Sequence, residues 1–116
     1  MTEQSPISEA QERFRQAVSA HWSAIRSGTT RDADKHSETA SQLVADAANA
    51  SELLTPLLDD AESPQVRCAA ATFLLNRGHA DEAVPVLEAL ADDDDIGLVA
   101  EDADMALESW RSKNAE

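Results

Sequence analysis

The sequence contains few of the residues that build tight turns and sheets. Of its 116 residues only three are glycine, two are phenylalanine and two are tryptophan, and none is tyrosine. Three glycines are too few for a protein made of β-hairpins, and they do not form a glycine-rich phosphate-binding loop. Most apolar residues are alanine, leucine or valine, and the first two favour helices. We therefore expect an all-α fold whose helices approach closely through small side chains.

Cysteine and long apolar runs are also scarce. The single cysteine, Cys68, cannot form a disulfide within the chain, and we expect a buried, unreactive thiol. No stretch approaches the roughly 18 consecutive apolar residues of a membrane-spanning helix. The N-terminus, residues 1–8, is too polar and acidic for a secretory signal. These features predict a cytoplasmic protein.

Positive charge is nearly missing from the larger part of the chain. The formal net charge is −14. Residues 1–35 hold five acidic and five basic side chains, whereas residues 36–116 hold 18 acidic and four basic ones. Such a field repels nucleic acids and anionic membranes and attracts a basic protein surface. The alternative is that the acidic side chains serve only solubility or adaptation to salt.

Apolar residues recur at helical spacing in six segments. The predicted helices begin near Pro6, Thr30, Ala50, Pro64 and Ala80 and after Asp95. Gly28 and Gly78 should end the first and fourth helices, and Ser63 should cap the start of the fourth. We place Pro85 near the first turn of the fifth helix. The short connections predict that consecutive helices pack antiparallel.

The C-terminal half contains an internal repeat. A shift of 33 residues superimposes Leu54 on Leu87, Leu57 on Leu90, Val66 on Val99, Ala70 on Ala103 and Leu74 on Leu107. Every pair is in phase with the apolar face of its helix, as in stacked helix–turn–helix units. We therefore expect about six antiparallel helices, stacked as pairs in a right-handed α-solenoid. They would form one domain over residues 6–111, between a flexible tail at 1–5 and a frayed tail at 112–116.

Two neighbouring segments resemble a HEAT repeat. They read Leu-Thr-Pro-Leu-Leu-Asp-Asp over residues 54–60 and Ser-Pro-Gln-Val-Arg-Cys-Ala-Ala over residues 63–70. HEAT repeats have a leucine-rich first helix, an acidic turn, and a second helix that opens with Pro-x-Val-Arg and two alanines. The resemblance implies a HEAT-like fold. In such a unit Val66 would fill the core, and Arg67 would reach the carbonyl or acidic groups of the turn.

A wider pattern covers residues 14–111. It comprises a first helix with a tryptophan, Gly-Thr-Thr-Arg-Asp-Ala-Asp-Lys-His at 28–36, Pro-Gln-Val-Arg-Cys-Ala-Ala-Ala at 64–71, Ala-Val-Pro-Val-Leu-Glu at 83–88 and Ala-Leu-Glu-Ser-Trp at 106–110. This pattern is similar to a family of small bacterial HEAT-like domains of unknown function. The resemblance implies a small stand-alone protein. Some similar HEAT-like proteins neutralise toxins used in bacterial competition.

The histidines do not form a recognisable metal site. His21, His36 and His79 lie in three separate segments, without cysteines at zinc spacing. Asp32 and Asp34 precede His36 at alternate positions, but such residues do not share one face of a helix. We interpret the two aspartates as charges at a helix start and His36 as a partly buried side chain, and we predict no metal and no cofactor.

Other candidate features also have a structural interpretation. Asp92–Asp95 lacks the alternating ligands and closing glutamate of a calcium loop, and an acidic turn that caps a helix explains it better. Trp22 and Trp110 are either core residues or binding anchors. Because no nucleophile motif accompanies Cys68, we predict that the protein is not an enzyme.

The predicted partner-binding surface consists of acidic residues from the last helix pairs. Spacing puts Glu101, Asp104 and Glu108 on one stripe of the last helix, away from its apolar face. The turn after Leu58 should lie at the same edge as the turn after Ala91, because the two are one repeat apart. The predicted partner-binding residues are Asp59, Asp60, Glu62, Asp92, Asp93, Asp94, Asp95, Glu101, Asp104 and Glu108.

The charge and the fold together predict a protein that binds another protein. The leading hypothesis is an immunity or inhibitor protein that docks on a basic toxin, for example a nuclease, and blocks it. The alternative hypothesis is a housekeeping scaffold or adaptor that binds a cellular protein through its helix ridges. We expect a monomer or a weak homodimer that binds neither nucleic acid nor membrane.

Overall fold

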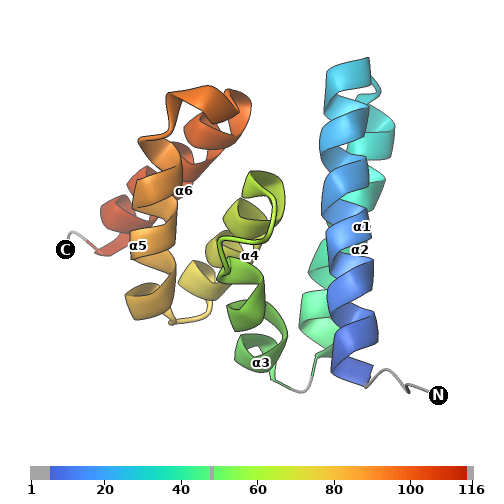
Figure 1. Ribbon diagram of the computed structural model, residues 1–116, viewed down its shortest axis with the longest axis horizontal. Helices are drawn as coiled ribbons and strands as arrows, with labels where there is room; N and C mark the ends of the chain where they lie inside the picture. Colours follow the sequence, from blue (N-terminus) through green and yellow to red (C-terminus); the bar gives the residue numbers. More distant parts are fainter. Residues whose placement is uncertain (1–5, 48, 115–116) are drawn as a thin grey trace. The chain divides into compact units, whose positions relative to one another are not determined.

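The computed structural model describes residues 6–47 and 49–114, and these residues form helices and turns without a strand. The helices are α1 (Pro6–Ser27), α2 (Thr30–Asp46), α3 (Ala50–Leu54), α4 (Pro64–Asn76), α5 (Ala80–Ala91) and α6 (Leu98–Asn114), with the 3-10 helices η1 (Thr55–Leu58) and η2 (Asp94–Ile96) (Figure 1). The predicted all-α fold class is confirmed. Among the described helices, none is both long and apolar enough to cross a membrane.

The chain divides into two compact units, Met1–Leu53 and Leu54–Glu116. We call them the N-terminal unit and the C-terminal unit. The first contains α1, α2 and most of α3, and the second contains η1, α4, η2, α5 and α6. The single domain over residues 6–111 stays a prediction.

The N-terminal unit is a pair of helices, α1 and α2, that lie side by side in Figure 1. Gly28 ends α1 with a φ of +79°, a left-handed conformation that glycine adopts without strain. Thr29 occupies the N-cap position of α2, but its hydroxyl donates to the carbonyl of Ala24 at 3.1 Å and makes no cap to α2. The buried apolar residues of the pair are Phe14, Ala17, Val18, Ala24, Ala33, Ala40 and Val44.

At the start of the C-terminal unit, the helix changes type next to a proline. A proline at position 56 has no N–H to donate to the preceding turn, and the chain continues from α3 as the 3-10 helix η1. Ser63 then caps α4, because its Oγ accepts a hydrogen bond from the N–H of Val66 at 3.3 Å. The predicted cap is confirmed. Arg67 forms an ion pair with Asp60 at 3.3 Å, which is the contact that the HEAT resemblance implied.

Helices α5 and α6 form the second pair of this unit, joined through η2 (Figure 1). Helix α5 begins at Ala80, so Pro85 lies inside the helix and beyond its first turn. Pro85 therefore lies about half a turn beyond the first turn, near which we predicted it. The carbonyl that Pro85 leaves without a donor belongs to Asp81, which is an exposed residue.

Helix α6 starts directly after Gly97 and is longer than predicted. Gly97 has φ +59° and ψ −124°, a backbone conformation that side chains strongly disfavour. The helix continues to Asn114, so residues 112–114 are helical, although we predicted a frayed end for them. The rest of that predicted tail, 115–116, and the predicted tail at 1–5 lie outside the described residues.

The repeat predicted in the C-terminal unit agrees with the pattern of burial. All ten residues that the 33-residue shift superimposes are buried, and none is more than 4% exposed. Each superimposed pair also lies in matching elements, α3 and η1 against α5 or α4 against α6. Two successive helix pairs therefore build the core of this unit from equivalent side chains.

Candidate functional site

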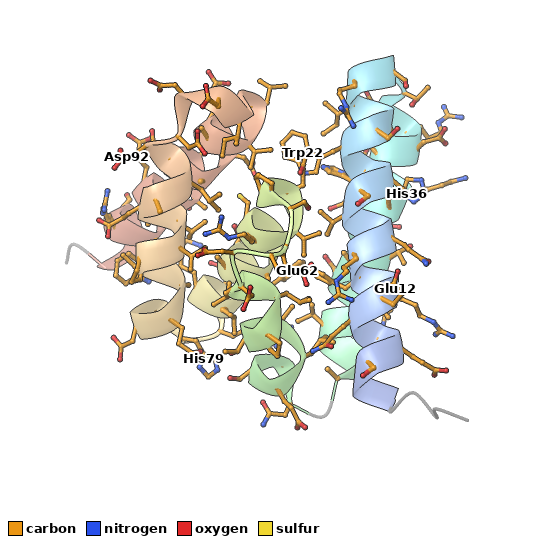
Figure 2. The ribbon with its side chains drawn as sticks, viewed as in Figure 1. Glu12, Trp22, His36, Glu62, His79 and Asp92 are labelled. Atoms are coloured by element: carbon orange, nitrogen blue, oxygen red, sulfur yellow. The ribbon has the colours of Figure 1, made fainter. Side chains whose placement is uncertain are left out.

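The two acidic turns lie at the same end of the C-terminal unit. The thiol of Cys68, the fifth residue of α4, donates a weak hydrogen bond to a carboxylate oxygen of Asp102, the fifth residue of α6, at 3.6 Å. The starts of α4 and α6 are therefore close together. At the other end, the hydroxyl of Thr55 donates to Glu82 in the first turn of α5 at 3.3 Å. Figure 2 labels His79 and Asp92 at opposite ends of α5.

The first acidic turn, after η1, has one strongly exposed carboxylate. The side chain of Asp60 is 97% exposed, although it pairs with the largely buried side chain of Arg67. Asp59 accepts a hydrogen bond from the N–H of Ala61 at 2.8 Å, which stabilises the turn locally. Glu62 is partly buried. Of these three predicted site residues, Asp59 and Asp60 are therefore exposed and Glu62 is not.

The second acidic turn, after α5, is exposed over all four aspartates, 92–95. Asp93 repeats the role of Asp59, because its carboxylate accepts a hydrogen bond from the N–H of Asp95 at 3.0 Å. The carboxylates of Asp92, Asp94 and Asp95 remain directed to solvent or to the surface beside them. The two turns thus share both their charge and their local hydrogen bonding.

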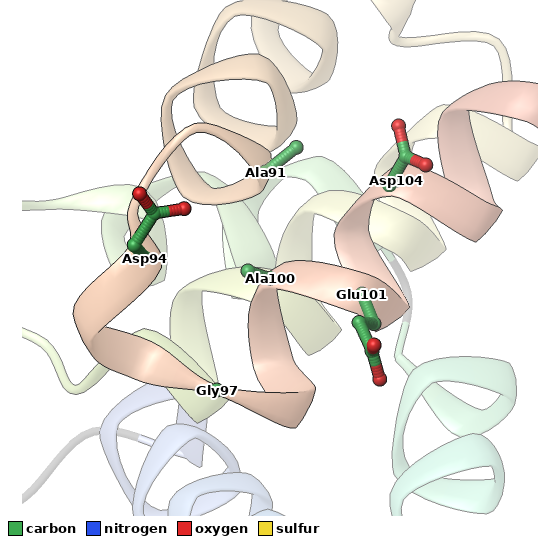
Figure 3. A pocket seen from close by; sticks show the side chains of 6 residues that line it. All are labelled: Ala91, Asp94, Gly97, Ala100, Glu101 and Asp104. Atoms are coloured by element: carbon green, nitrogen blue, oxygen red, sulfur yellow. The ribbon is translucent and has the colours of Figure 1, made fainter.

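Three predicted carboxylates surround a shallow depression of about 320 Å³. It is lined by the carboxylates of Asp94, Glu101 and Asp104 and by the small residues Ala91, Gly97 and Ala100 (Figure 3). The carboxylates that line the depression thus come from η2 and α6. The structure therefore brings Asp94 together with the stripe on α6.

A second depression of about 240 Å³ adjoins the first along α6, and Asp104 lines both. This depression also has a positive charge in its lining, from Arg111. Arg111 forms an ion pair with Glu88 at 3.2 Å, and both side chains are about half exposed. Glu108 is exposed on α6, as predicted. We use the name acidic surface for Asp59, Asp60, Glu62, Asp92, Asp93, Asp94, Asp95, Glu101, Asp104 and Glu108.

Cys68 is buried and its thiol is hard to ionise. The pKa of Cys68 is raised from 9.0 to about 12. Burial is the largest cause, and the negative charge of Asp102 and the hydrogen bond to it also raise the pKa. The side chain of Thr72 acts in the opposite direction. At neutral pH the sulfur is therefore a protonated thiol, which is a poor nucleophile.

The histidines and tryptophans do not define a site. Within residues 6–47 and 49–114, no group of three or more His, Cys, Asp or Glu side chains is arranged to hold a metal ion. Nδ1 of His21 lies 2.7 Å from the carbonyl of Ala33, and its ring meets that of Trp22 edge-on. Trp22 and Trp110 are both partly buried.

The sequence analysis did not identify two exposed apolar residues. Leu98 is 56% exposed and Met105 is 64% exposed, and both belong to α6. The available signal was their spacing, because apolar residues seven apart lie on one face of a helix. That face differs from the one that carries Val99 and Leu107, which alone had been assigned to α6.

A comparison of the chain with protein-family models, curated proteins and solved structures finds no match. The resemblance to small bacterial HEAT-like domains therefore stays a prediction.

Proposed function

We propose that this protein is a non-enzymatic binding module that docks through its acidic surface on a basic surface of another protein. The partner we favour is a toxin with a basic substrate-binding groove, such as a nuclease has, and the docked module would inhibit it. The proposal depends mainly on one observation. Carboxylates from two turns and one helix gather at one end of the C-terminal unit.

The charge distribution supports a basic partner. Between Gly78 and Trp110 the chain has eleven acidic residues and no lysine or arginine. Of the basic residues in the C-terminal unit, Arg67 and Arg111 already pair with Asp60 and Glu88. The remaining field attracts a basic protein, accelerates its association and repels nucleic acid.

Two of the acidic residues stabilise their turns through hydrogen bonds, so they are less suitable for testing the role of charge. Asp59 and Asp93 accept backbone hydrogen bonds in their turns, so their replacement would change the turns as well as the charge. Asp104 and Glu108 are exposed, lie four residues apart on α6 and accept no hydrogen bond of this kind among the described contacts. They are the better probes of binding.

The test compares two charge reversals of equal size. Asp104→Lys with Glu108→Lys reverses two carboxylates of the acidic surface. Asp34→Lys with Glu38→Lys reverses two exposed carboxylates at the same spacing on α2. Both double variants have the same net charge, so a difference between them reports on position rather than on overall charge.

Each protein is immobilised and exposed to a lysate of the native cells, and retained proteins are identified by mass spectrometry. We expect a basic protein that wild type and the α2 variant retain and that the α6 variant loses, with an affinity that falls steeply as salt rises. Equal retention by both variants would contradict the proposal. Retention of a housekeeping complex whose activity the module does not inhibit would favour the scaffold hypothesis.

A further inference from the structure

Large apolar side chains are rarely exposed in the described part of this chain, and two of the exceptions lie on one helix. The exposed large hydrophobic residues are Ile25, Leu98 and Met105. Ile25 is isolated on α1, and single exposed residues of this kind need no explanation. Leu98 and Met105 both belong to α6 and are more exposed than Ile25.

Leu98 and Met105 form a ridge on the solvent side of α6. They are seven residues apart, which is two turns, so their side chains lie one above the other. The buried residues Val99, Ala103 and Leu107 lie on another side of the helix, turned by about 100–180° from Leu98. We call Leu98 and Met105 the α6 ridge.

Carboxylates flank the α6 ridge on both sides. Helical spacing puts Glu101 and Glu108 on the side toward the depression, because each follows a ridge residue by three positions. Asp102 follows Leu98 by four positions and lies on the other side, where it accepts the hydrogen bond from Cys68 of α4. An apolar centre with an acidic rim is the anatomy of a protein-binding surface.

We propose that the α6 ridge receives a basic amphipathic α-helix of the partner. Apolar residues of that helix would pack on Leu98 and Met105, and its lysines or arginines would pair with Glu101, Asp102 and Glu108. This inference rests on the proposed function and adds the kind of partner segment that the acidic surface takes.

The spacing and the charge select this occupant. Leu98 and Met105 lie about 10 Å apart along the helix axis, at 1.5 Å per residue. A helix with anchors at positions i and i+7 matches that distance. A second copy of this chain fits poorly, because α6 packed on α6 would bring Glu101, Asp102 and Glu108 against carboxylates of the same kind.

The test uses a synthetic peptide of about 18 residues, long enough for five helical turns. Leucines occupy one face of the peptide and lysines the other. A control peptide has the same composition with the leucines spread around the helix. Binding is measured by titration of the full chain labelled with ¹⁵N, which gives both the affinity and the residues whose amide signals move.

The matched variants remove apolar surface without changing charge. Leu98→Gln with Met105→Gln makes the α6 ridge polar, and both sites are exposed, so the fold should be retained. Ile25→Gln changes the third exposed apolar residue and serves as the control. Circular dichroism checks that each variant is folded.

We expect wild type and the Ile25→Gln variant to bind the amphipathic peptide alike, with signal changes centred on residues 98–109. The ridge variant should bind at least about tenfold more weakly, as loss of anchor residues does. The control peptide should bind weakly to all three proteins. Equal binding by the ridge variant, or equal binding of the two peptides, would overturn the inference.

Two further outcomes separate this inference from the proposed function. A cellular partner that the Asp104→Lys, Glu108→Lys variant loses but the ridge variant retains would overturn the inference and leave the proposed function intact. Self-association of wild type in sedimentation equilibrium, abolished in the ridge variant, would show that the occupant is a second copy and would also overturn it.

Discussion

Raising the pH from about 8 to about 10.5 should destabilise the C-terminal unit, because the buried thiol of Cys68 resists ionisation. Its pKa in the folded protein is raised to about 12, whereas in the unfolded chain it lies near 9.0. Over the intervening pH range the unfolded chain loses the proton and the folded chain keeps it. The stability that the protonated thiol contributes is therefore complete below pH 9 and decreases as the pH rises toward 12.

The size of the effect follows from the two pKa values. Within the window, each pH unit costs about 1.4 kcal/mol of unfolding free energy for one group. Integrated from pH 8 to pH 10.5, the loss due to Cys68 is about 2 kcal/mol. The chain has no tyrosine, so no phenol titrates in this pH range.

Urea unfolding at several pH values tests this prediction. Trp110 lies in the C-terminal unit, and its fluorescence reports on that unit once Trp22 is replaced by phenylalanine. Cys68→Ala in the same background removes the thiol at a fixed cost of about 1 kcal/mol for the lost buried atom. The unfolding free energy of the parent should fall by about 2 kcal/mol more than that of Cys68→Ala between the two pH values. Parallel pH profiles would refute the reasoning.

Four further changes should weaken the C-terminal unit, each by an amount that urea unfolding can resolve. Ser63→Ala removes the acceptor for the N–H of Val66 and should cost about 1 kcal/mol, while Ser63→Asp should restore most of it. Gly97→Ala should cost roughly 1–3 kcal/mol through backbone strain alone, since nothing lies within 4 Å of the added Cβ; an unchanged stability would contradict the φ of +59°. Leu74→Ala and Leu107→Ala occupy equivalent repeat positions and should each cost about 2–5 kcal/mol, and a large effect at only one would contradict the repeat.

Local signals explain why much of the fold was predictable. The hydrogen bond from Val66 to Ser63 spans three residues, and Gly28 and Gly78 end helices through their own backbone conformation. These features depend on neighbouring residues, so the sequence displays them directly. The repeat was equally visible, because burial imposes the same apolar residue at Leu74 and at Leu107.

The position of Pro85 was predicted only approximately because it depends on the balance between two energies, a lost backbone hydrogen bond and the burial of apolar side chains. The start of α5 near Ala80 was predicted, but Pro85 lies beyond the first turn, and the one lost hydrogen bond is outweighed by the burial of Leu87 and Leu90 on the same helix. The general preference of proline for the first turn of a helix does not take this balance into account.

The candidate site was predictable in composition but not in detail. The acidic stripe on α6 followed from spacing, whereas the depression depends on how η2 approaches Ala91 and Ala100. Leu98 and Met105 were overlooked because helical periodicity identifies the buried side of a helix. Two exposed apolar residues on the other side do not contribute to that periodic pattern.

The hydrogen bond between Cys68 and Asp102 links the interior of the C-terminal unit to its surface. The negative charge of Asp102 helps to keep the thiol protonated. A cationic side chain bound at Asp102 would cancel part of that charge and make Cys68 easier to ionise. Because such coupling is reciprocal, ionisation of Cys68 would in turn strengthen the binding of the cation at Asp102. The pKa of a buried thiol would thus depend on whether a partner is bound to α6, although the partner does not contact the sulfur.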